Sequence, residues 1–482
     1  MRAALALAFV SGASLAAACG TEEHFQLVRR NAIAARAAAS SALASAPAGA
    51  ATVATGPKAA ASTIQTATRT DEASAATVTN PAQECTYYSY PPVTALQAQK
   101  VFPPIWEIAN LSTAQPEVLA LFNALNGSIP KISPRGTPSG NFTGVKYNGT
   151  EDPYCWWTWK QCHTPKLAGL PEDIYMVPEP QTWGFSLDDG PNCSHNAFYD
   201  FLYEQKQKAT LFYIGSNVLD WPLQAQRGLS DGHEVCAHTW SHRYMTSLSN
   251  EEVFAEFYYS KKAIKDVLGV TVQCWRPPYG DVDDRVRYIA NALGMRTITW
   301  LDNTFDYDIS TLPRSDIMAN YAAIIQKGQN GTFATNGTIV LTHELNSGTM
   351  GLMMENYPKI KSAFKNVVPV GVALNNTQPY VEKEFIYPNF AQYVAGTLSV
   401  SLVAPTAVST DASLSLPLSS GASSSISATV MYASTTASGG SAANAQSSGK
   451  SAAGRNIESG VLGAVVAAVV GAVGAGAMAV LV

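Results

Sequence analysis

Charged side chains are scarce in this sequence, and clusters of basic ones are missing. Of the 482 residues, 14% are charged, and 36 acidic side chains against 31 basic ones give a net charge of −5. No stretch gathers lysine and arginine into a block. Proteins that bind nucleic acids carry a basic patch or stripe that faces the phosphates. The sequence therefore argues against a nucleic-acid partner.

Aromatic residues are few at both ends of the sequence, which are rich in alanine, serine and threonine. The middle carries every tryptophan and every histidine except His24. Segments of such composition bury too little apolar surface to offset the entropy of folding. We therefore expect disordered Ser/Thr/Ala-rich flanks. Residues 19–84 are predicted to be a low-complexity linker or pro-segment, and residues 401–453 an O-glycosylated stalk.

The N-terminus has the pattern of a targeting signal. Met1 and Arg2 form a short positive region, and an apolar run from Ala3 to Leu15 follows that is too short to span a bilayer. Small residues then offer a cleavage site. This order predicts a secretory signal peptide over residues 1–18.

The C-terminal segment, residues 454–482, contains an uncharged apolar run with no lysine or arginine after it. Such a run is long enough to cross a membrane. A polar spacer and small residues precede it, a combination that predicts a GPI-anchor signal with attachment around Ser447, Ser448, Gly449 and Ser451. The protein is then expected outside the cell, anchored by lipid to the plasma membrane, the cell wall or both. A plain tail anchor is the alternative.

Six cysteines follow Cys19, and an even number in a secreted chain suggests three disulfides. They are Cys85, Cys155, Cys162, Cys193, Cys236 and Cys274. Cys155 and Cys162 are close enough to close a small loop, but fifteen connectivities are open. The lack of a C-x-x-C pair argues against a zinc site made of these cysteines.

Sequons for N-glycosylation agree with secretion. The expected sites are Asn110, Asn126, Asn141, Asn148, Asn330, Asn336 and Asn375. Asn192 also starts a sequon, but it lies directly after a pair of aspartates and is the least suited to carry a glycan.

Extended stretches alternate with helical ones from Thr182 onward. Strands are expected over 182–189, 209–214, 233–237, 271–275, 295–301, 338–342 and 367–372, and helices over 195–207, 217–229, 250–267, 282–292, 315–327 and 350–364. The alternation predicts an α/β domain over 181–400 with a parallel sheet. Roughly seven units favour a barrel over an open sheet. Residues 85–180, rich in proline and aromatics, are expected to pack on this domain as an N-terminal extension without chemistry of their own.

Polar residues suited to catalysis follow the strands, at the point where each one ends. They are Asp188 and Asp189, His238 and His242, Arg276 to Gly280, Asn303 to Asp306, and His343. Active sites of parallel barrels are built at this carboxyl-terminal rim. Residues with unrelated structural roles would not all fall at the same end of the strands.

His238 and His242 stand four residues apart, which places two imidazoles on one side of a helical turn. Together with Asp189 they make three ligands that leave a position open for water, as in catalytic zinc sites. Asp188 is then available as general base. The alternatives are an ordinary Asp-Asp-Gly turn and a chance histidine pair. His233, inside a strand, is predicted to be a core histidine.

Three further residues fit supporting roles. Arg276 could pair with Asp188 and hold it ionised, and His343 could be the general acid that protonates a leaving group. Asp306 could orient His343 and raise its pKa, with Asp302 as a rival. The alternative for Arg276 is an ordinary loop arginine, and His343 taken alone fits a structural histidine better than a catalytic one.

Four motifs resemble, in the same order, those of the polysaccharide deacetylases of carbohydrate esterase family 4. They are Asp188-Asp189-Gly190-Pro191, His238-Thr239-Trp240-Ser241-His242, Arg276-Pro277-Pro278-Tyr279 and Leu341-Thr342-His343. The resemblance implies that residues 181–400 form a distorted (β/α) barrel with a zinc- or cobalt-dependent N-deacetylase site. It further implies an oxyanion contact from the backbone N–H of Tyr279 and an acetyl pocket lined by Leu341.

Two departures from the family pattern stand out. Ser186-Leu187 replaces the common Thr-Phe, which is conservative. The fourth motif reads Asn303-Thr304-Phe305-Asp306-Tyr307, without its usual first aspartate and tryptophan. The partner of His343 is therefore left open.

The flanks resemble those of fungal chitin deacetylases of the basidiomycete type. The implied reaction removes acetyl groups from N-acetylglucosamine units of chitin, giving chitosan and acetate, in cell-wall biogenesis. Expected partners are chitin and its oligomers, a membrane through the GPI lipid, and wall glucan. Two alternatives stay open: an esterase of the same fold acting on acetylated xylan, and a non-catalytic glycan-binding wall mannoprotein.

Overall fold

The computed structural model describes residues 69–397. The predicted signal peptide 1–18, stalk 401–453 and anchor tail 454–482 lie outside the described residues, as do the attachment candidates Ser447, Ser448, Gly449 and Ser451. Most of the predicted linker 19–84 lies outside them too. Within residues 69–397, no helix is both long enough and apolar enough to cross a membrane.

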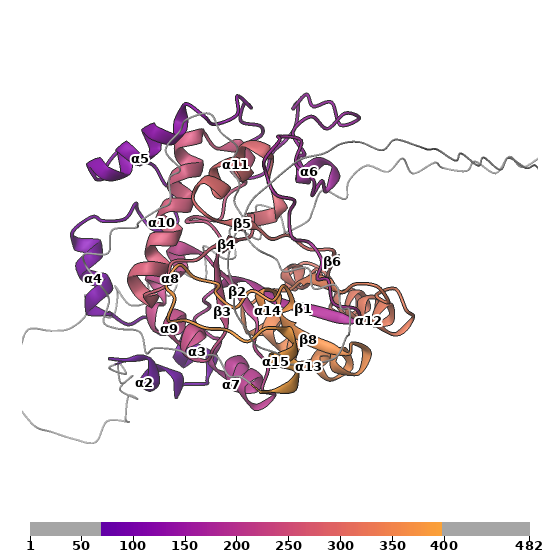
Figure 1. The fold of residues 1–482 in the computed structure, drawn as a ribbon. Helices are drawn as coiled ribbons and strands as arrows, with labels where there is room; N and C mark the ends of the chain where they lie inside the picture. The colour runs from indigo at the N-terminus through magenta and orange to yellow at the C-terminus, as the bar shows by residue number, and fades with distance from the viewer. Residues whose placement is uncertain (1–68, 398–482) are drawn as a thin grey trace, which may run out of the picture. The chain divides into compact units, whose positions relative to one another are not determined.

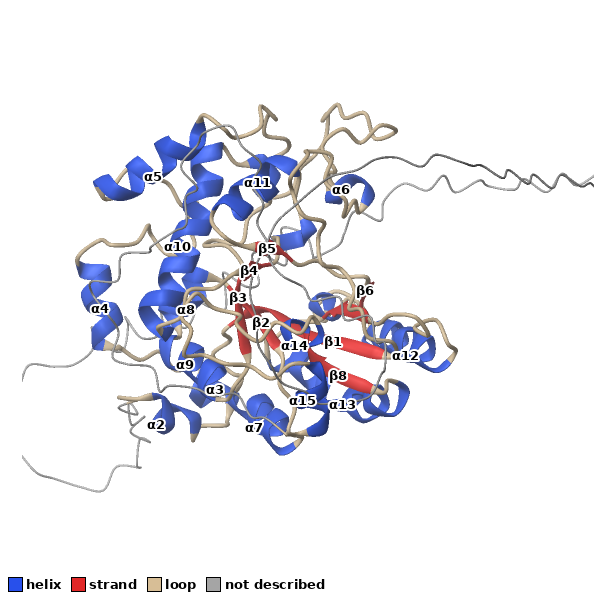
Figure 2. Cartoon of the chain, viewed as in Figure 1, coloured by secondary structure: helices blue, strands red, loops and turns tan. Residues whose placement is uncertain are grey.

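A parallel sheet forms the centre of the described chain (Figure 2). Its strand order is β5-β4-β3-β2-β1-β7-β6, and β8 also pairs with β1. The strands are β1 (Thr182–Gly190), β2 (Thr210–Tyr213), β3 (Glu234–Ala237), β4 (Cys274–Trp275), β5 (Arg296–Thr297), β6 (Asp302–Asn303), β7 (Thr338–Leu341) and β8 (Asn366–Pro369). Every pairing between them is parallel, as the repeated strand–helix units predict.

The sheet curls back on itself through one extended stretch, residues 296–303. Its first half bonds to β4: the N–H of Ile298 donates to the carbonyl of Trp275 at 2.9 Å. Its second half bonds to β7: the N–H of Leu301 donates to the carbonyl of Ile339 at 2.9 Å. The strand predicted over 295–301 is therefore shorter, β5 alone, and a second short strand, β6, follows directly after the predicted range, so that the stretch serves both edges of the sheet. This arrangement is the predicted distorted (β/α) barrel.

Helices follow the strands and surround the sheet (Figure 1). Those of the barrel are α7 (Asn196–Glu204), α8 (Gly215–Asp220), α9 (Pro222–Ser230), α10 (Asn250–Leu268), α11 (Asp284–Ala292), α12 (Arg314–Gln329) and α13 (Ser347–Ala363). Short helices η1 (Met245–Ser247), η2 (Pro278–Gly280) and η3 (Asp306–Asp308) lie in the loops, and α15 (Phe390–Ala395) follows the barrel. The boundaries of the barrel helices agree with the predicted ones to within a few residues.

The prediction of a last strand over 367–372 is wrong beyond Pro369. There the chain turns into a short helix, α14 (Val370–Ala373). The N–H of Val370 donates to Thr210 Oγ1 at 2.8 Å, and the N–H of Gly371 donates to Glu234 Oε2 at 2.9 Å. These two side chains capture backbone donors that a continuing strand would have offered to a neighbouring strand.

Strand β1 places the aspartate pair at the middle of the sheet. All nine of its residues are buried, as expected for a parallel strand covered on both faces. Its first half pairs with β8 and β7, and the half that begins at Ser186 pairs with β2. The register shifts between Leu187 and Gly190, which is an irregularity at the two aspartates. Bulges of this kind re-aim side chains beside active sites.

The N-terminal extension packs against the barrel helices. Its helices are α4 (Pro91–Ala98), α5 (Pro116–Asn126) and α6 (Trp157–Lys160), and α5 lies at an angle beside one end of α10 (Figure 1). Buried polar contacts fix it in place: Trp106 Nε1 donates to Asp220 Oδ2 at 3.0 Å, and the N–H of Ala109 donates to Glu256 Oε1 at 2.9 Å.

The folded part begins earlier than the predicted boundary at residue 84. Helices α2 (Glu72–Ala76) and α3 (Pro81–Glu84) lie inside the stretch expected to be a linker. The buried carboxylate of Glu84 accepts the N–H of Asn196 at 2.9 Å. This specific contact holds the segment on α7, and composition alone does not reveal it.

The three predicted disulfides are present, with the pairing Cys85–Cys193, Cys155–Cys162 and Cys236–Cys274. Cys155 and Cys162 close the small loop expected from their spacing. Most of the predicted glycosylation sites are exposed: Asn110, Asn126, Asn141, Asn148, Asn330 and Asn375. Asn336 is half-buried. Asn192 uses its side-chain nitrogen to donate to the carbonyl of Leu345 at 2.6 Å, so it is poorly placed for a glycan.

Candidate active site

The loops at the carboxyl ends of the strands bring the predicted site residues together. β1 and the segment after β7 meet directly, because Asp188 and His343 form a parallel bridge. All of the predicted site side chains are buried: Asp188, Asp189, His238, His242, Arg276, Tyr279, Asp306, Leu341 and His343. A buried group of this many ionisable side chains is costly unless its members pair with one another or with an ion.

Asp189, His238 and His242 form the candidate metal-binding group. Their ligand atoms all lie within 4.8 Å of one another. Asp189 Oδ1 is 3.4 Å from His238 Nε2 and 3.1 Å from His242 Nε2. Both imidazoles therefore turn the same nitrogen toward one carboxylate.

The outer nitrogens of the two imidazoles have partners that orient the rings. His238 Nδ1 lies 2.8 Å from the carbonyl oxygen of Arg276, which can only accept, so Nδ1 carries the proton and Nε2 the lone pair. His242 Nδ1 lies 3.2 Å from the hydroxyl of Tyr279. Histidines that bind metals show this arrangement. Among the described residues, the buried His238 Nε2 has no hydrogen-bond partner.

Two imidazoles and one carboxylate are ligands typical of zinc and related divalent ions. The residues present therefore fit a divalent metal, and they leave room in its coordination shell for water. The other groups of potential ligands in the described chain contain disulfide-bonded cysteines, at Cys155–Cys162 and Cys236–Cys274, which are not available as thiolates.

Asp188 lies beside this group and is held by Arg276. Arg276 Nη1 donates to Asp188 Oδ1 at 2.6 Å and to Ser186 Oγ at 3.1 Å. Its other nitrogens donate to the carbonyls of Ile298 and Thr299. The guanidinium is thus fixed by the sheet on one side and orients the carboxylate on the other.

Asp306, and not Asp302, is the partner of His343. Asp306 Oδ1 lies 2.6 Å from His343 Nδ1, and its Oδ2 accepts the backbone N–H of His343 at 2.9 Å. Asp302 instead binds Lys327 and Thr338. A proton on Nδ1 leaves Nε2 as the nitrogen that can take up and release a second one. The altered fourth motif therefore still provides a carboxylate for the histidine.

The rim loops share an unusual backbone conformation. Asp189, His242, Tyr279 and Phe305 have φ angles of 71°, 56°, 59° and 56°, in the left-handed region that residues other than glycine rarely adopt. Such conformations cluster at functional sites, where the surrounding structure holds them.

Leu341, at the end of β7, is buried two residues before His343.

The polysaccharide deacetylase family matches residues 176–298. A protein named chitin deacetylase 2 from Cryptococcus neoformans var. grubii is 55% identical over 339 residues, which are 69% of this chain and 74% of that protein. The chain belongs to the polysaccharide deacetylase family. A chitin deacetylase from Amylomyces rouxii is 48% identical over 63% of this chain and 73% of its own length.

Among solved structures, the chitin deacetylase of Colletotrichum lindemuthianum is similar over 44% of this chain and 96% of its own, with 22% identity and a TM-score of 0.41. The span matched by the polysaccharide deacetylase family includes the metal-binding group, Asp188, Arg276 and Tyr279. Asp306, Leu341 and His343 lie beyond it.

Two buried carboxylates behind the rim, those of Glu256 and Glu344, are not predicted from the sequence. Glu256 of α10 accepts the N–H groups of Trp240 and Ser241 at 2.9 and 2.8 Å, so it holds the loop that carries both histidines. Burial raises the pKa of this carboxyl, and its hydrogen bonds oppose that rise. An acidic residue on the buried face of an amphipathic helix is the one sequence signal that could have revealed it.

Glu344 forms the second group, directly behind the aspartate pair. Its Oε2 accepts the hydroxyl of Tyr199 at 2.8 Å, and that hydroxyl lies 3.1 Å from the one of Tyr213. Burial raises the pKa of Glu344 to about 8. A Cβ on Gly190 would lie 1.5 Å from Glu344 Oε1, so the Asp-Asp-Gly turn needs glycine there.

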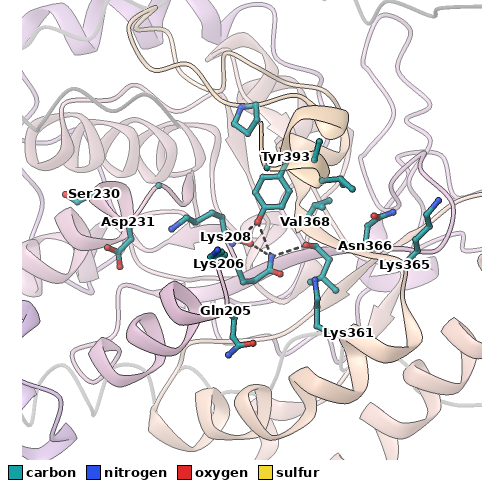
Figure 3. Close-up of a pocket in the computed structure, with 17 residues that line it drawn as sticks. Gln205, Lys206, Lys208, Ser230, Asp231, Lys361, Lys365, Asn366, Val368 and Tyr393 are labelled. Carbon is teal, nitrogen blue, oxygen red and sulfur yellow. Dashed lines mark hydrogen bonds between the residues drawn. The ribbon is translucent and has the colours of Figure 1, made fainter. Parts of the chain in front are cut away.

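A separate cavity of about 650 Å³ lies at the opposite ends of the strands (Figure 3). Its lining precedes β2 and β3 and begins β8, and it includes Lys206, Lys208, Lys361, Lys365 and Tyr393. The Tyr393 hydroxyl accepts the N–H of Lys208 at 2.9 Å. None of the predicted site residues lines this cavity. It is therefore distinct from the candidate active site.

Proposed function

We propose that this protein is a metal-dependent deacetylase of chitin, releasing acetate from N-acetylglucosamine units and leaving chitosan. One observation carries the proposal: a two-histidine, one-carboxylate group lies beside an arginine-held aspartate and an aspartate-held histidine on one barrel rim. Relatives at 48–55% identity that bear the name chitin deacetylase support the choice of substrate.

Asp189, His238 and His242 hold the divalent ion in this proposal, with zinc or cobalt as the candidates. When bound, such an ion polarises the acetyl carbonyl and lowers the pKa of water. The protein's own contribution at this point is orientation. The Arg276 carbonyl and the Tyr279 hydroxyl fix the rotation of the two imidazoles.

Asp188 acts as general base in the attack step. It takes a proton from the attacking water as the new C–O bond forms at the acetyl carbon. Arg276 aims this carboxylate, because its Nη1 donates to Asp188 Oδ1 at 2.6 Å and is itself fixed by the sheet. The backbone N–H of Tyr279 is assigned to the developing oxyanion, and Leu341 to the wall that contacts the acetyl methyl group.

His343 acts as general acid in the second step. Its Nε2 gives a proton to the sugar nitrogen as the C–N bond breaks, so the amine and acetate leave separately. Asp306 accepts from Nδ1, which selects the tautomer and stabilises the protonated ring.

Asp306→Asn is expected to lower kcat by about 10²- to 10⁴-fold, because an amide facing Nδ1 disfavours the required tautomer. Steady-state acetate release measures this loss. Asp302→Asn is the matched control. It makes the same chemical change in β6, at a side chain that binds Lys327 and Thr338 and does not contact His343. Equal activity of both variants would exclude Asp306 from the acid step.

The rest of the chain is assigned to delivery and anchoring. In the proposal, residues 1–18 direct secretion, 85–180 support the catalytic domain 181–400, and 401–453 and 454–482 form the stalk and GPI signal. The mature protein stays at the plasma membrane or the wall, where chitin and wall glucan lie. Three disulfides and exposed sequons support an extracellular location.

The choice of substrate is tested by acetate release from chitin oligomers and from acetylated xylan under one set of conditions. The proposal expects release from chitin well above that from xylan. The reverse preference would assign the same site to a xylan esterase. Binding to chitin without release from either polymer would favour a non-catalytic glycan-binding protein.

A further inference from the structure

Few aromatic rings reach the surface of the described chain, and two of them share one loop. Trp159 is 48% exposed and Tyr154 36% exposed. The third exposed ring within residues 69–397, Tyr203, lies on α7. Large exposed aromatics cost solvation free energy, so a pair of them close together indicates a binding surface.

The loop that displays Trp159 is rigid. The disulfide Cys155–Cys162 closes it, and α6 occupies the turn between the two cysteines. Its other two tryptophans, Trp156 and Trp157, are buried, with 0% and 2% exposure. The exposed ring stacks on Trp156 at 5.9 Å between centroids. Trp159 is therefore presented in one orientation, which lowers the entropy cost of binding.

The same loop is fastened to the catalytic loop that follows β4. Asp281, directly after η2, accepts Trp156 Nε1 at 2.9 Å and Thr158 Oγ1 at 2.5 Å. Gly280 has a φ of 71°, and a Cβ there would fall 2.3 Å from the ring of Trp157. The Trp159 loop is thereby packed directly against the Arg276–Gly280 loop.

A series of ring contacts connects the candidate metal group with this loop. The Tyr279 ring lies 4.7 Å from the His242 ring and stacks on Tyr244 at 4.0 Å. Tyr244 contacts Phe142 at 5.4 Å, and Phe142 contacts Trp156 at 5.2 Å. These packed rings thus link the loop that carries Trp159 to the loops that carry the candidate metal-binding group.

We propose that Trp159, together with Tyr154, whose ring contacts the same Tyr147 ring, is a stacking platform for pyranose rings of the polysaccharide outside the catalytic centre. The electron-rich face of an aromatic ring attracts the polarised C–H groups of a sugar ring. This platform belongs to the N-terminal extension, before the stretch that matches the deacetylase family. The inference rests on the proposed function for the identity of the sugar polymer.

The kinetic test compares wild type and Trp159→Ala on chitin oligomers of two to six units and on the polymer. KM is expected to rise about threefold to tenfold for long substrates, the size of an aromatic contact, with kcat unchanged. The effect should shrink toward the dimer, and Trp159→Phe should restore part of it. Tyr203→Ala removes an exposed ring on α7 and is the matched control.

A second arm separates this inference from the proposed reaction. Sedimentation with insoluble chitin, using metal-free protein, measures binding without turnover, and Trp159→Ala should bind less while Tyr203→Ala binds like wild type. Wild type and each variant are measured as the natural chain and again with Asn148→Gln, because Asn148 is a predicted glycan site beside Gly149, where an added Cβ would lie 1.8 Å from Trp159 Nε1. Reduced chitin binding without any acetate release would keep the platform and overturn the reaction. Unchanged binding and unchanged KM at all lengths would overturn the platform.

Discussion

Replacing Asp188 by asparagine is expected to lower kcat for acetate release by about 10²- to 10⁴-fold, the range that a general base contributes. Asparagine keeps an oxygen for Arg276 Nη1 but cannot take a proton from water. Arg276 also retains its bonds to Ser186, Ile298 and Thr299, so the buried guanidinium stays satisfied. The loss is therefore expected in kcat, with substrate binding nearly unchanged.

A second buried ion pair provides the matched control for this variant. Asp173 binds Arg287 through both carboxylate oxygens, at 2.8 and 2.6 Å, away from the rim. Asp173→Asn should lower stability, as the loss of a buried charge partner does, while kcat stays at the wild-type value. A folded Asp188→Asn protein with near-normal kcat would remove Asp188 from the chemistry.

His238→Ala is expected to reduce both bound metal and activity, the latter to below about 1% of wild type, because one of three ligands and its orienting contact are lost. Metal analysis of the purified protein and acetate release measure the two effects independently. His163→Ala is the control: His163 is half-buried, contacts Thr299, and has a pKa lowered to about 4 by burial. Full metal content in His238→Ala would show that the ion binds elsewhere.

The sequence predicts the sheet and the rim well because both rest on strong local patterns. β1 is a fully buried strand that ends in two aspartates, and its apolar run is visible in the sequence. His238 and His242 do come together, but the helical turn expected to carry them is absent: residues 238–242 form an irregular loop in which Thr239 and His242 have φ angles of 62° and 56°. Since parallel strands end at one rim, order along the chain is enough to bring these residues together.

Elsewhere the outcome depends on contacts between distant residues. The first half of the stretch 296–303 forms hydrogen bonds with β4 and the second half with β7. No local sequence pattern shows that one stretch pairs with two different strands. The sequence suggests Asp306 as the partner of His343 and leaves Asp302 as a rival, and the contacts of the two carboxylates with distant residues decide for Asp306. Glu344 acts through Tyr199, 145 residues away in the sequence, so no local pattern predicts it, whereas Glu256 leaves only the weak signal of an acidic residue on a buried helix face.

Metal dependence is the central claim of this account, and one titration tests it most directly. Acetate release from chitin oligomers is measured on the intact protein, then after removal of metal with a chelator, and again after addition of Zn²⁺ or Co²⁺, with bound metal quantified at each stage. The account predicts that activity and bound metal fall together and return together, at about one ion per chain set by Asp189, His238 and His242. Full activity in protein shown to be free of metal would contradict it.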